Sequence, residues 1–283
     1  MGSVTWRIQI THHSGYRYQG EVNSSYNEAR ITPLSTDRQV VLDASVTVAP
    51  AATVFRYWDY WGTLVDAFEV HQPHTELAVT GSSVVETSEP QRHPERVGWD
   101  VLAGRAVVDE YAEYLTPTRF TPVDEELADA ARHLVARHDP LDACQAAVEW
   151  ARSRLRYEAG TTDASSSGLQ ALHHGVGVCQ DFAHVTLALL RAMGIPGRYV
   201  SGYLHPDRSA PVGGTVTGQS HAWVDAWVGD WMPLDPTNGD AVGERHVVVG
   251  RARDYADVSP LQGIYHGGPA EALVVNVELT RQA

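Results

Sequence analysis

The chain contains no lysine: its 21 basic residues are all arginine. This absence excludes the two sites that require a lysine, the phosphate-binding loop of nucleotide hydrolases and the Schiff base of pyridoxal enzymes. Cysteine is also scarce. Cys144 and Cys179 are the only two, too few for a disulfide framework or a cysteine-based zinc site. A reducing interior is therefore the better expectation.

Long hydrophobic runs are missing as well, because no window approaches 18 consecutive apolar residues. The first residues enter a strand-like pattern without the apolar core of a signal peptide. Acidic residues outnumber basic ones by 35 to 21, and the net charge of −14 argues against nucleic acid or an anionic membrane as a partner. We expect a globular, soluble, cytoplasmic protein, since 283 residues with 43% apolar content can bury a sizeable core.

The first hundred or so residues carry the pattern of short β-strands. β-Branched and aromatic residues partly alternate with polar ones, and turn signals such as Ser14-Gly15 and Ala49-Pro50 separate the runs. This spacing predicts an antiparallel β-sandwich or a small barrel, followed by a connection over about Thr87–Phe120. The predicted strands are Thr5–Thr11, Gln39–Val48, Val54–Trp61, Leu64–His71 and Glu76–Glu86.

The pattern then changes to helices. Thr121-Pro122 and Asp139-Pro140 each combine a capping residue with a proline at the first helical position, which predicts helices over about Pro122–Arg137 and Pro140–Leu155. Strands return from Gly197, so the second half is predicted to be α+β, with a division into residues 1–115 and 116–283. The later strands are Gly197–Leu204, Ser220–Val228, Trp231–Leu234, His246–Val249 and Leu273–Leu279.

Cys179 is the candidate nucleophile. It opens a helix whose apolar residues follow 3–4 spacing and which ends near Gly194 and Pro196. At a helix N-terminus, unpaired N–H groups and the helix dipole favour an anionic thiolate and can also hold an oxyanion. Position alone leaves a second interpretation open, an inert buried cysteine, so the partners of Cys179 must decide.

His221 is the candidate base and Asp235 its orienting acid. Ser220–Val228 alternates strictly, so His221, Trp223 and Asp225 share one face of a strand. Asp235 follows 14 residues later, on the expected adjacent strand. A regular two-residue turn at Gly229-Asp230 would place His221 and Asp235 on opposite faces of the sheet. The pair therefore predicts a longer, odd-numbered loop, or a bulge near Pro233.

Five ordered blocks of this sequence resemble the bacterial transglutaminase-like proteins, often called putative cysteine proteases. The first hundred residues also look like the β-rich N-terminal domain of that family. The resemblance implies a papain-like core behind a β-sandwich, with Cys179 as nucleophile, His221 as base and Asp235 as orienting acid. The blocks are Gly177–His184, Gly194–Tyr203, Ser220–Trp223, Leu234–Asn238 and Arg253–Gly263.

Three further residues are candidates for the oxyanion site or the cleft. Tyr157 matches an aromatic position upstream of the nucleophile in the family, although core packing is an equally good interpretation. Gln180 and Trp223 are the other two. The paired histidines His12-His13 and His173-His174 raise the question of a metal, but neighbouring residues point apart and no metal motif is present. We expect no metal and no cofactor.

The residues together indicate a cysteine-nucleophile amide hydrolase of the peptidase or isopeptidase type, acting through a thioester acyl-enzyme. The expected partner is a peptide or protein amide, and the oligomeric state is left open. One alternative is a protein–glutamine acyltransferase that uses the same three residues. Another is a catalytically idle interaction module built on the β-sandwich.

Overall fold

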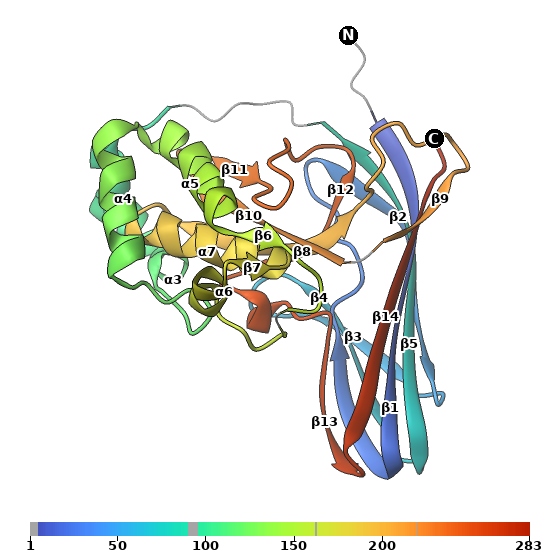
Figure 1. The fold of residues 1–283 in the computed structure, drawn as a ribbon. Helices are drawn as coiled ribbons and strands as arrows, with labels where there is room; N and C mark the ends of the chain where they lie inside the picture. The colour runs from blue at the N-terminus through green and yellow to red at the C-terminus, as the bar shows by residue number, and fades with distance from the viewer. Residues whose placement is uncertain (1–4, 90–95, 162, 219) are drawn as a thin grey trace.

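The computed structural model describes residues 5–89, 96–161, 163–218 and 220–283. Within these residues the chain forms two antiparallel sheets and a group of helices packed on the smaller one (Figure 1). The predicted α+β class is thereby confirmed. Residues 90–95 of the expected connection lie outside the described residues, and the rest of that connection contains three short helices, α1 (Trp99–Leu102), α2 (Arg105–Glu110) and α3 (Ala112–Leu115).

The larger sheet is organised around one long strand, β1, over Thr5–Ala29. The first part of β1 pairs with β5 and β14, and after a register shift beyond Arg17 the second part pairs with β4 and β13. Val22 of β1 packs with Phe68 and Val70 of β4 and with Leu77 and Val79 of β5 in one buried cluster. The result is a curled antiparallel sheet in the part of the chain that was predicted to be a sandwich. The other strands are β2 (Gln39–Ala49), β3 (Val54–Trp58), β4 (Leu64–Val70), β5 (His74–Ser88), β9 (Thr215–Gly218), β13 (Leu261–Gly267) and β14 (Ala270–Arg281).

The two ends of the chain meet in this sheet. β14 pairs with β1 from Ile8↔Arg281 to Tyr18↔Ala270, and β13 continues along β1. β13 and β14 therefore belong to the larger sheet, whereas their sequence position placed them in the second predicted part, residues 116–283. The boundary at residue 115 stays a prediction. In Figure 1, β14 runs beside β1 within the larger sheet.

The smaller sheet carries the helices. Its strand order is β11-β10-β8-β12, and α7 packs on the face of β10 that presents Ala222, Val224 and Ala226. The strands are β8 (Gly197–Leu204), β10 (Ser220–Trp227), β11 (Trp231–Leu234) and β12 (His246–Ala252), with a short parallel pair of β6 (Arg156–Tyr157) and β7 (Val176–Gly177). The helices are α4 (Glu125–Arg137), α5 (Pro140–Arg154), α6 (Gly168–His174) and α7 (Cys179–Ala192), and η1 is a short 3-10 helix over Tyr255–Asp257.

One helix start is predicted correctly and one is not. α5 begins at Pro140 with Asp139 accepting a hydrogen bond from the backbone N–H of Asp142. α4 begins three residues later than Pro122, with Asp124 as the cap. The reason is tertiary: Thr121 is fully buried, and its hydroxyl accepts from the Arg191 guanidinium instead of capping a helix.

Arg191 joins several of these elements. Its guanidinium is 95% buried and donates to Thr121 Oγ1 and to the carbonyls of Tyr114, Gly197 and Arg253 at 2.5–3.1 Å. We expect Arg191→Met to lower the free energy of unfolding by about 3 kcal/mol, because the buried carbonyls lose their charged donor. Urea denaturation measures this change.

The matched control is Arg105→Met, in which the side chain removed is 93% exposed and makes a single ion pair with Asp109. This variant should unfold at nearly the wild-type urea concentration. Equal effects at the two positions would contradict the stabilising role of Arg191.

Candidate active site

Cys179 is the first residue of α7 and is half-buried. The helix start is held by Asp181, whose Oδ2 accepts from the backbone N–H of Val178 at 2.8 Å, while the backbone N–H of Asp181 donates to the Val178 carbonyl. The backbone N–H groups of Cys179 and Gln180 have no acceptor among the described residues. Free N–H groups at this point are suited to hold a developing negative charge.

His221 connects Cys179 to Asp235. Its Nε2 lies 2.9 Å from Asp235 Oδ2, and it also shares a hydrogen bond with the Cys179 side chain. Since Nε2 faces the carboxylate, Nδ1 is the nitrogen left for the sulfur. His221 is 9% exposed and Asp235 2% exposed, so both side chains are largely removed from water.

The register prediction is confirmed. β10 and β11 pair as Trp227↔Trp231 and Val224↔Leu234, which leaves an odd-numbered connection of three residues, 228–230. Gly229 in this loop has a φ of 97°, a conformation that favours glycine. The odd loop brings Asp235, just past the end of β11, to the same face as His221.

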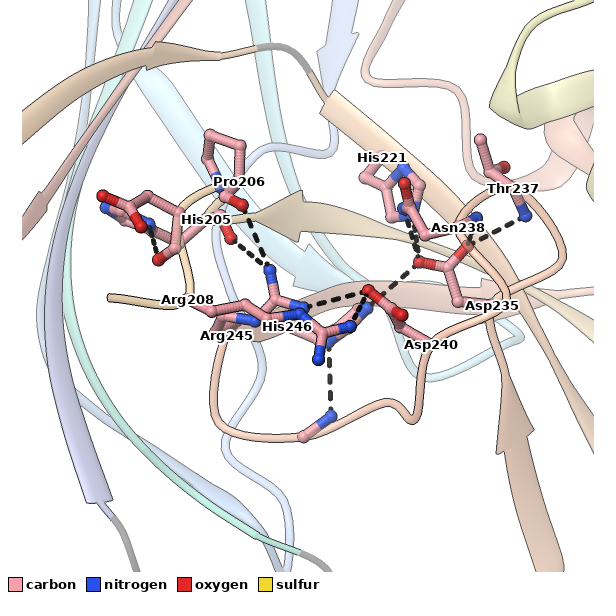
Figure 2. Close-up of polar contacts among 12 residues, drawn as sticks. His205, Pro206, Arg208, His221, Asp235, Thr237, Asn238, Asp240, Arg245 and His246 are labelled. Atoms are coloured by element: carbon pink, nitrogen blue, oxygen red, sulfur yellow. Dashed lines mark hydrogen bonds and ion pairs between the residues drawn. The ribbon is translucent and has the colours of Figure 1, made fainter. Parts of the chain in front are cut away.

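Asp235 is held by donors on all sides, as Figure 2 shows. Its Oδ1 accepts from the backbone N–H groups of Thr237 and Asn238, and its Oδ2 accepts from the Asn238 side chain at 2.9 Å. A second histidine, His246, places its Nε2 3.3 Å from the same Oδ2. These donors fix the carboxylate so that one lone pair of Oδ2 faces His221.

The electrostatics follow from these contacts. Burial by itself lowers the pKa of His221, but hydrogen bonds and charge interactions with Asp235 and Cys179 outweigh it and raise the pKa to about 9. Burial raises the pKa of Asp235, but the hydrogen bonds from His221, His246 and Asn238 hold that pKa far below its usual range. Burial lowers the pKa of His246, despite its contact with Asp235. His221 is therefore the histidine suited to carry a proton at neutral pH.

His246 and Trp223 form the layer behind His221. The backbone N–H of Gly243 donates to His246 Nδ1, so His246 Nε2 carries the hydrogen that faces Asp235. The Trp223 ring is 1% exposed and packs against both imidazoles. Trp223 thus differs from the expectation that it lies in the cleft: Gly202 opposite leaves room for its ring, and it supports the histidines from below.

The cleft itself has a volume of about 220 Å³ and is lined by Cys179 and His221 together with Tyr157 and Gln180. Tyr157 is 50% exposed and sits beside Gly177 through the pairing of β6 with β7, which favours the cleft interpretation over core packing. Gln180 Nε2 is buried and has no hydrogen-bond partner among the described residues, so it is available as a donor. The opposite wall comes from the larger sheet: His12, Ser14, Leu273 and Val275.

A metal could be considered at one place, because donor atoms of His221, Asp235 and His246 lie within 4.8 Å of one another. The hydrogen bonds of these three residues are not those expected at a metal site. A neutral imidazole that binds a metal through Nε2 carries its hydrogen on Nδ1, but His246 Nδ1 accepts from Gly243. The arrangement fits a network that holds protons.

Several site residues escaped the sequence analysis. Thr237 and Asn238 lie inside the block Leu234–Asn238, but their hydrogen bonds to Asp235 depend on the geometry of the turn and could not be predicted from the sequence. His246 had no sequence signal beyond its place in a predicted strand. The wall formed by β1 and β14 could not be anticipated, because it depends on pairing between the two ends of the chain.

Comparison with known proteins identifies the family of the chain. Residues 128–236 match the transglutaminase-like superfamily, and residues 8–86 match the bacterial transglutaminase-like N-terminal region. An uncharacterized Mycobacterium leprae protein is 52% identical over 98% of this chain and 100% of its own length. An uncharacterized Mycobacterium tuberculosis protein is 32% identical over 96% of this chain and 91% of its own length. The chain belongs to the transglutaminase-like superfamily.

A solved structure supports the fold. The putative cysteine protease from Cytophaga hutchinsonii aligns with a TM-score of 0.74 over 99% of this chain and 100% of that chain, at 20% sequence identity. The shared architecture includes both the β-rich part and the helical part, since the match spans nearly the whole chain. Among the described residues, every helix is too short or too polar to cross a bilayer.

Proposed function

We propose that the protein is a cysteine-nucleophile amide hydrolase that cleaves peptide or isopeptide bonds through a thioester acyl-enzyme. The observation that carries this proposal is the hydrogen-bonded chain from Cys179 through His221 to Asp235, at the head of a helix and in a cleft. A nucleophile, a base and a group that orients the base are the three components that acyl transfer requires.

The first half-reaction begins with the proton on His221 and the negative charge on Cys179. The sulfur attacks the carbonyl carbon of the amide, and the backbone N–H groups of Cys179 and Gln180 stabilise the oxyanion. Gln180 Nε2 and the Tyr157 hydroxyl are further donors in the same cleft. The C–N bond then breaks as His221 gives its proton to the leaving nitrogen, which departs as an amine.

The second half-reaction restores the enzyme. Neutral His221 takes a proton from water, and the water oxygen attacks the thioester carbonyl. The C–S bond breaks, the carboxylic acid leaves, and Cys179 is released as a thiolate beside protonated His221. Asp235 keeps the imidazole in one orientation through both steps and favours its protonated form.

The test uses p-nitrophenyl acetate, a small activated ester that reports acylation by releasing p-nitrophenol. We expect a burst of release and an acetyl group on Cys179 in the intact mass, and Cys179→Ala should lose both. Cys144→Ala is the matched control, because Cys144 is fully buried and its pKa is raised by burial. Acetylation that persists in Cys179→Ala would refute the proposal.

Adding an amine, glycinamide, separates hydrolysis from acyl transfer. If acetate stays the only product, water is the acceptor and the hydrolase proposal is supported. If acetylglycinamide becomes the main product at millimolar amine, the acceptor is an amine and the acyltransferase alternative replaces it.

His246 is a positioning residue in this scheme. His246→Leu should lower kcat about tenfold with little change in KM, because Asp235 loses one donor and its orientation toward His221 loosens. His246→Gln retains an N–H donor near that position and should recover most of kcat. Steady-state kinetics on p-nitrophenyl acetate measure both, and equal losses in the two variants would indicate a packing role against Trp223 instead.

A further inference from the structure

β14 carries an exposed apolar run beside the cleft. Leu273, Val274 and Val275 are consecutive and are 52%, 58% and 44% exposed. Apolar, β-branched residues on an open strand edge are a liability that proteins usually cover or interrupt with charge. An edge of this composition that remains open is suited to pair with another extended chain.

The edge is open at that point. Among the described residues, β9 pairs with β14 over Val277–Thr280, and β1 pairs with the opposite side of β14 along its whole length. In the described part of the chain, no strand covers the outer side of residues 270–276 (Figure 1).

The direction of the backbone groups can be followed from the end of β14. The N–H and the C=O of Arg281 bond to residues 213–214, on the β9 side, whereas the N–H of Gln282 donates to Arg7, on the β1 side. Backbone groups alternate between the two sides along an antiparallel strand, and the register from Arg281 to Ala272 is unbroken.

Every second residue before Arg281 therefore directs its N–H and C=O groups to the same side as Arg281. Val275 and Leu273 are among these residues, so their backbone groups face the open edge. Those of Val274 face β1. The side chains of Leu273 and Val275 line the cleft that holds Cys179. Two residues thus offer both unpaired backbone groups and apolar side chains next to the nucleophile.

We propose that the edge of β14 at Leu273 and Val275 binds the acyl substrate as an extended polypeptide segment. The substrate main chain pairs with β14 as an added strand, and its alternate side chains contact Leu273 and Val275. This inference rests on the proposed function of the same cleft and specifies its substrate class. It also gives the larger sheet a role, since this sheet then holds the chain that Cys179 attacks.

A second copy of the protein is the competing occupant. Pairing of two β14 edges would place a partner strand across the cleft that contains Cys179, and such a dimer would close the site. Leu273 and Val275 belong to both the open edge and the cleft, so the occupant of the edge also lies in the cleft. This favours a substrate over a second copy of the protein.

The probe is fluorescein-labelled α-lactalbumin that has been reduced and carboxymethylated, which keeps it extended. Its binding to Cys179→Ala is measured by fluorescence anisotropy. Leu273→Pro or Val275→Pro is then added to Cys179→Ala. Each removes one backbone N–H that faces the open edge and makes no hydrogen bond to β1, so each should raise Kd about tenfold. Val274→Ala is the matched control, because its side chain lies on the other face and its backbone faces β1, so Kd should not change.

Leu273→Glu keeps the backbone N–H and should also weaken binding, because it replaces the apolar side chain with a charged one. It tests the same edge without the risk that a proline disturbs the fold. The circular dichroism spectrum and the urea midpoint of Leu273→Pro should match those of its parent, which shows that the proline variant is folded. Proline variants that bind the probe as tightly as the parent overturn the inference, as does a parent that does not bind it. A concentration-dependent dimer that Leu273→Pro abolishes would assign the edge to a second copy. A wild type inert toward the ester removes the proposed function instead, independently of the binding result.

Discussion

His221→Ala is expected to lower kcat/KM for the cleavage of carboxymethylated α-lactalbumin about 10⁴-fold, to nearly the background rate. His221 holds the proton next to Cys179 and is the only group in the scheme that delivers it to the leaving nitrogen. An amide nitrogen is a poor leaving group without that proton, so the loss should be larger for amides than for p-nitrophenyl acetate. Release of new amino groups measures the rate.

The control for this variant is His71→Ala, because His71 is a 61% exposed residue paired with Glu69 in the β-rich part. It should cleave at the wild-type rate. Circular dichroism checks that His221→Ala is folded. A folded His221→Ala protein with more than a tenth of wild-type activity on the amide would exclude His221 as the general acid and base.

Asp235→Asn is expected to lower kcat about 10³-fold and to shift the pH profile. The asparagine amide removes the charge, and its NH₂ group cannot accept the hydrogen bonds that His221, His246 and Asn238 now donate to Oδ2. Burial lowers the pKa of His221, and in this variant the charge of Asp235 no longer opposes that effect. The pKa of His221 therefore falls.

The sign of the pH effect follows. In the wild type the pKa of about 9 keeps His221 protonated at neutral pH, and activity should decline as the pH rises through about 9. In Asp235→Asn this alkaline decline should move to lower pH. Rate–pH profiles for the cleavage of carboxymethylated α-lactalbumin measure the shift, because the leaving amide nitrogen requires the proton of His221. His246→Gln is the comparison variant that keeps the Asp235 carboxylate. An unchanged alkaline limb in Asp235→Asn would mean that another group sets it.

The same pKa has a consequence for stability. His221 binds its proton more tightly in the folded protein than at its ordinary pKa of 6.5. Its contribution to stability is therefore fully present below pH 6.5 and is lost as the pH rises through about 9. This part of the pH dependence should be weaker in Asp235→Asn.

The parts of the site that obey local rules could be predicted from the sequence. Cys179 stands at the start of α7 because glycines and a strand precede it and a periodic apolar face follows it. The strict alternation around His221 specifies the face of β10. The mismatch between that face and Asp235 was itself informative, since it required the odd-numbered loop that the structure contains at residues 228–230.

Local rules failed where a distant partner competed for a side chain. Thr121 has the residue type of a helix cap, but Arg191, 70 residues away, takes its hydroxyl. Trp223 shares the face of His221, yet that face is covered, so its ring packs beneath the two imidazoles and does not line the cleft. In both cases the residue type was correct for the predicted role and the surroundings decided otherwise.

The sequence by itself determined the local positions of Cys179, His221 and Asp235, because helix ends, strand faces and turn parity depend on neighbours a few positions apart. Only the tertiary structure decided the second histidine on Asp235 and the wall opposite Cys179. His246 reaches Asp235 across the small sheet, and β14 reaches the cleft by pairing with β1 from the other end of the chain. Such contacts depend on which of many possible long-range strand pairings is the most stable. That stability comes from the burial of whole sheet faces, which no single motif encodes.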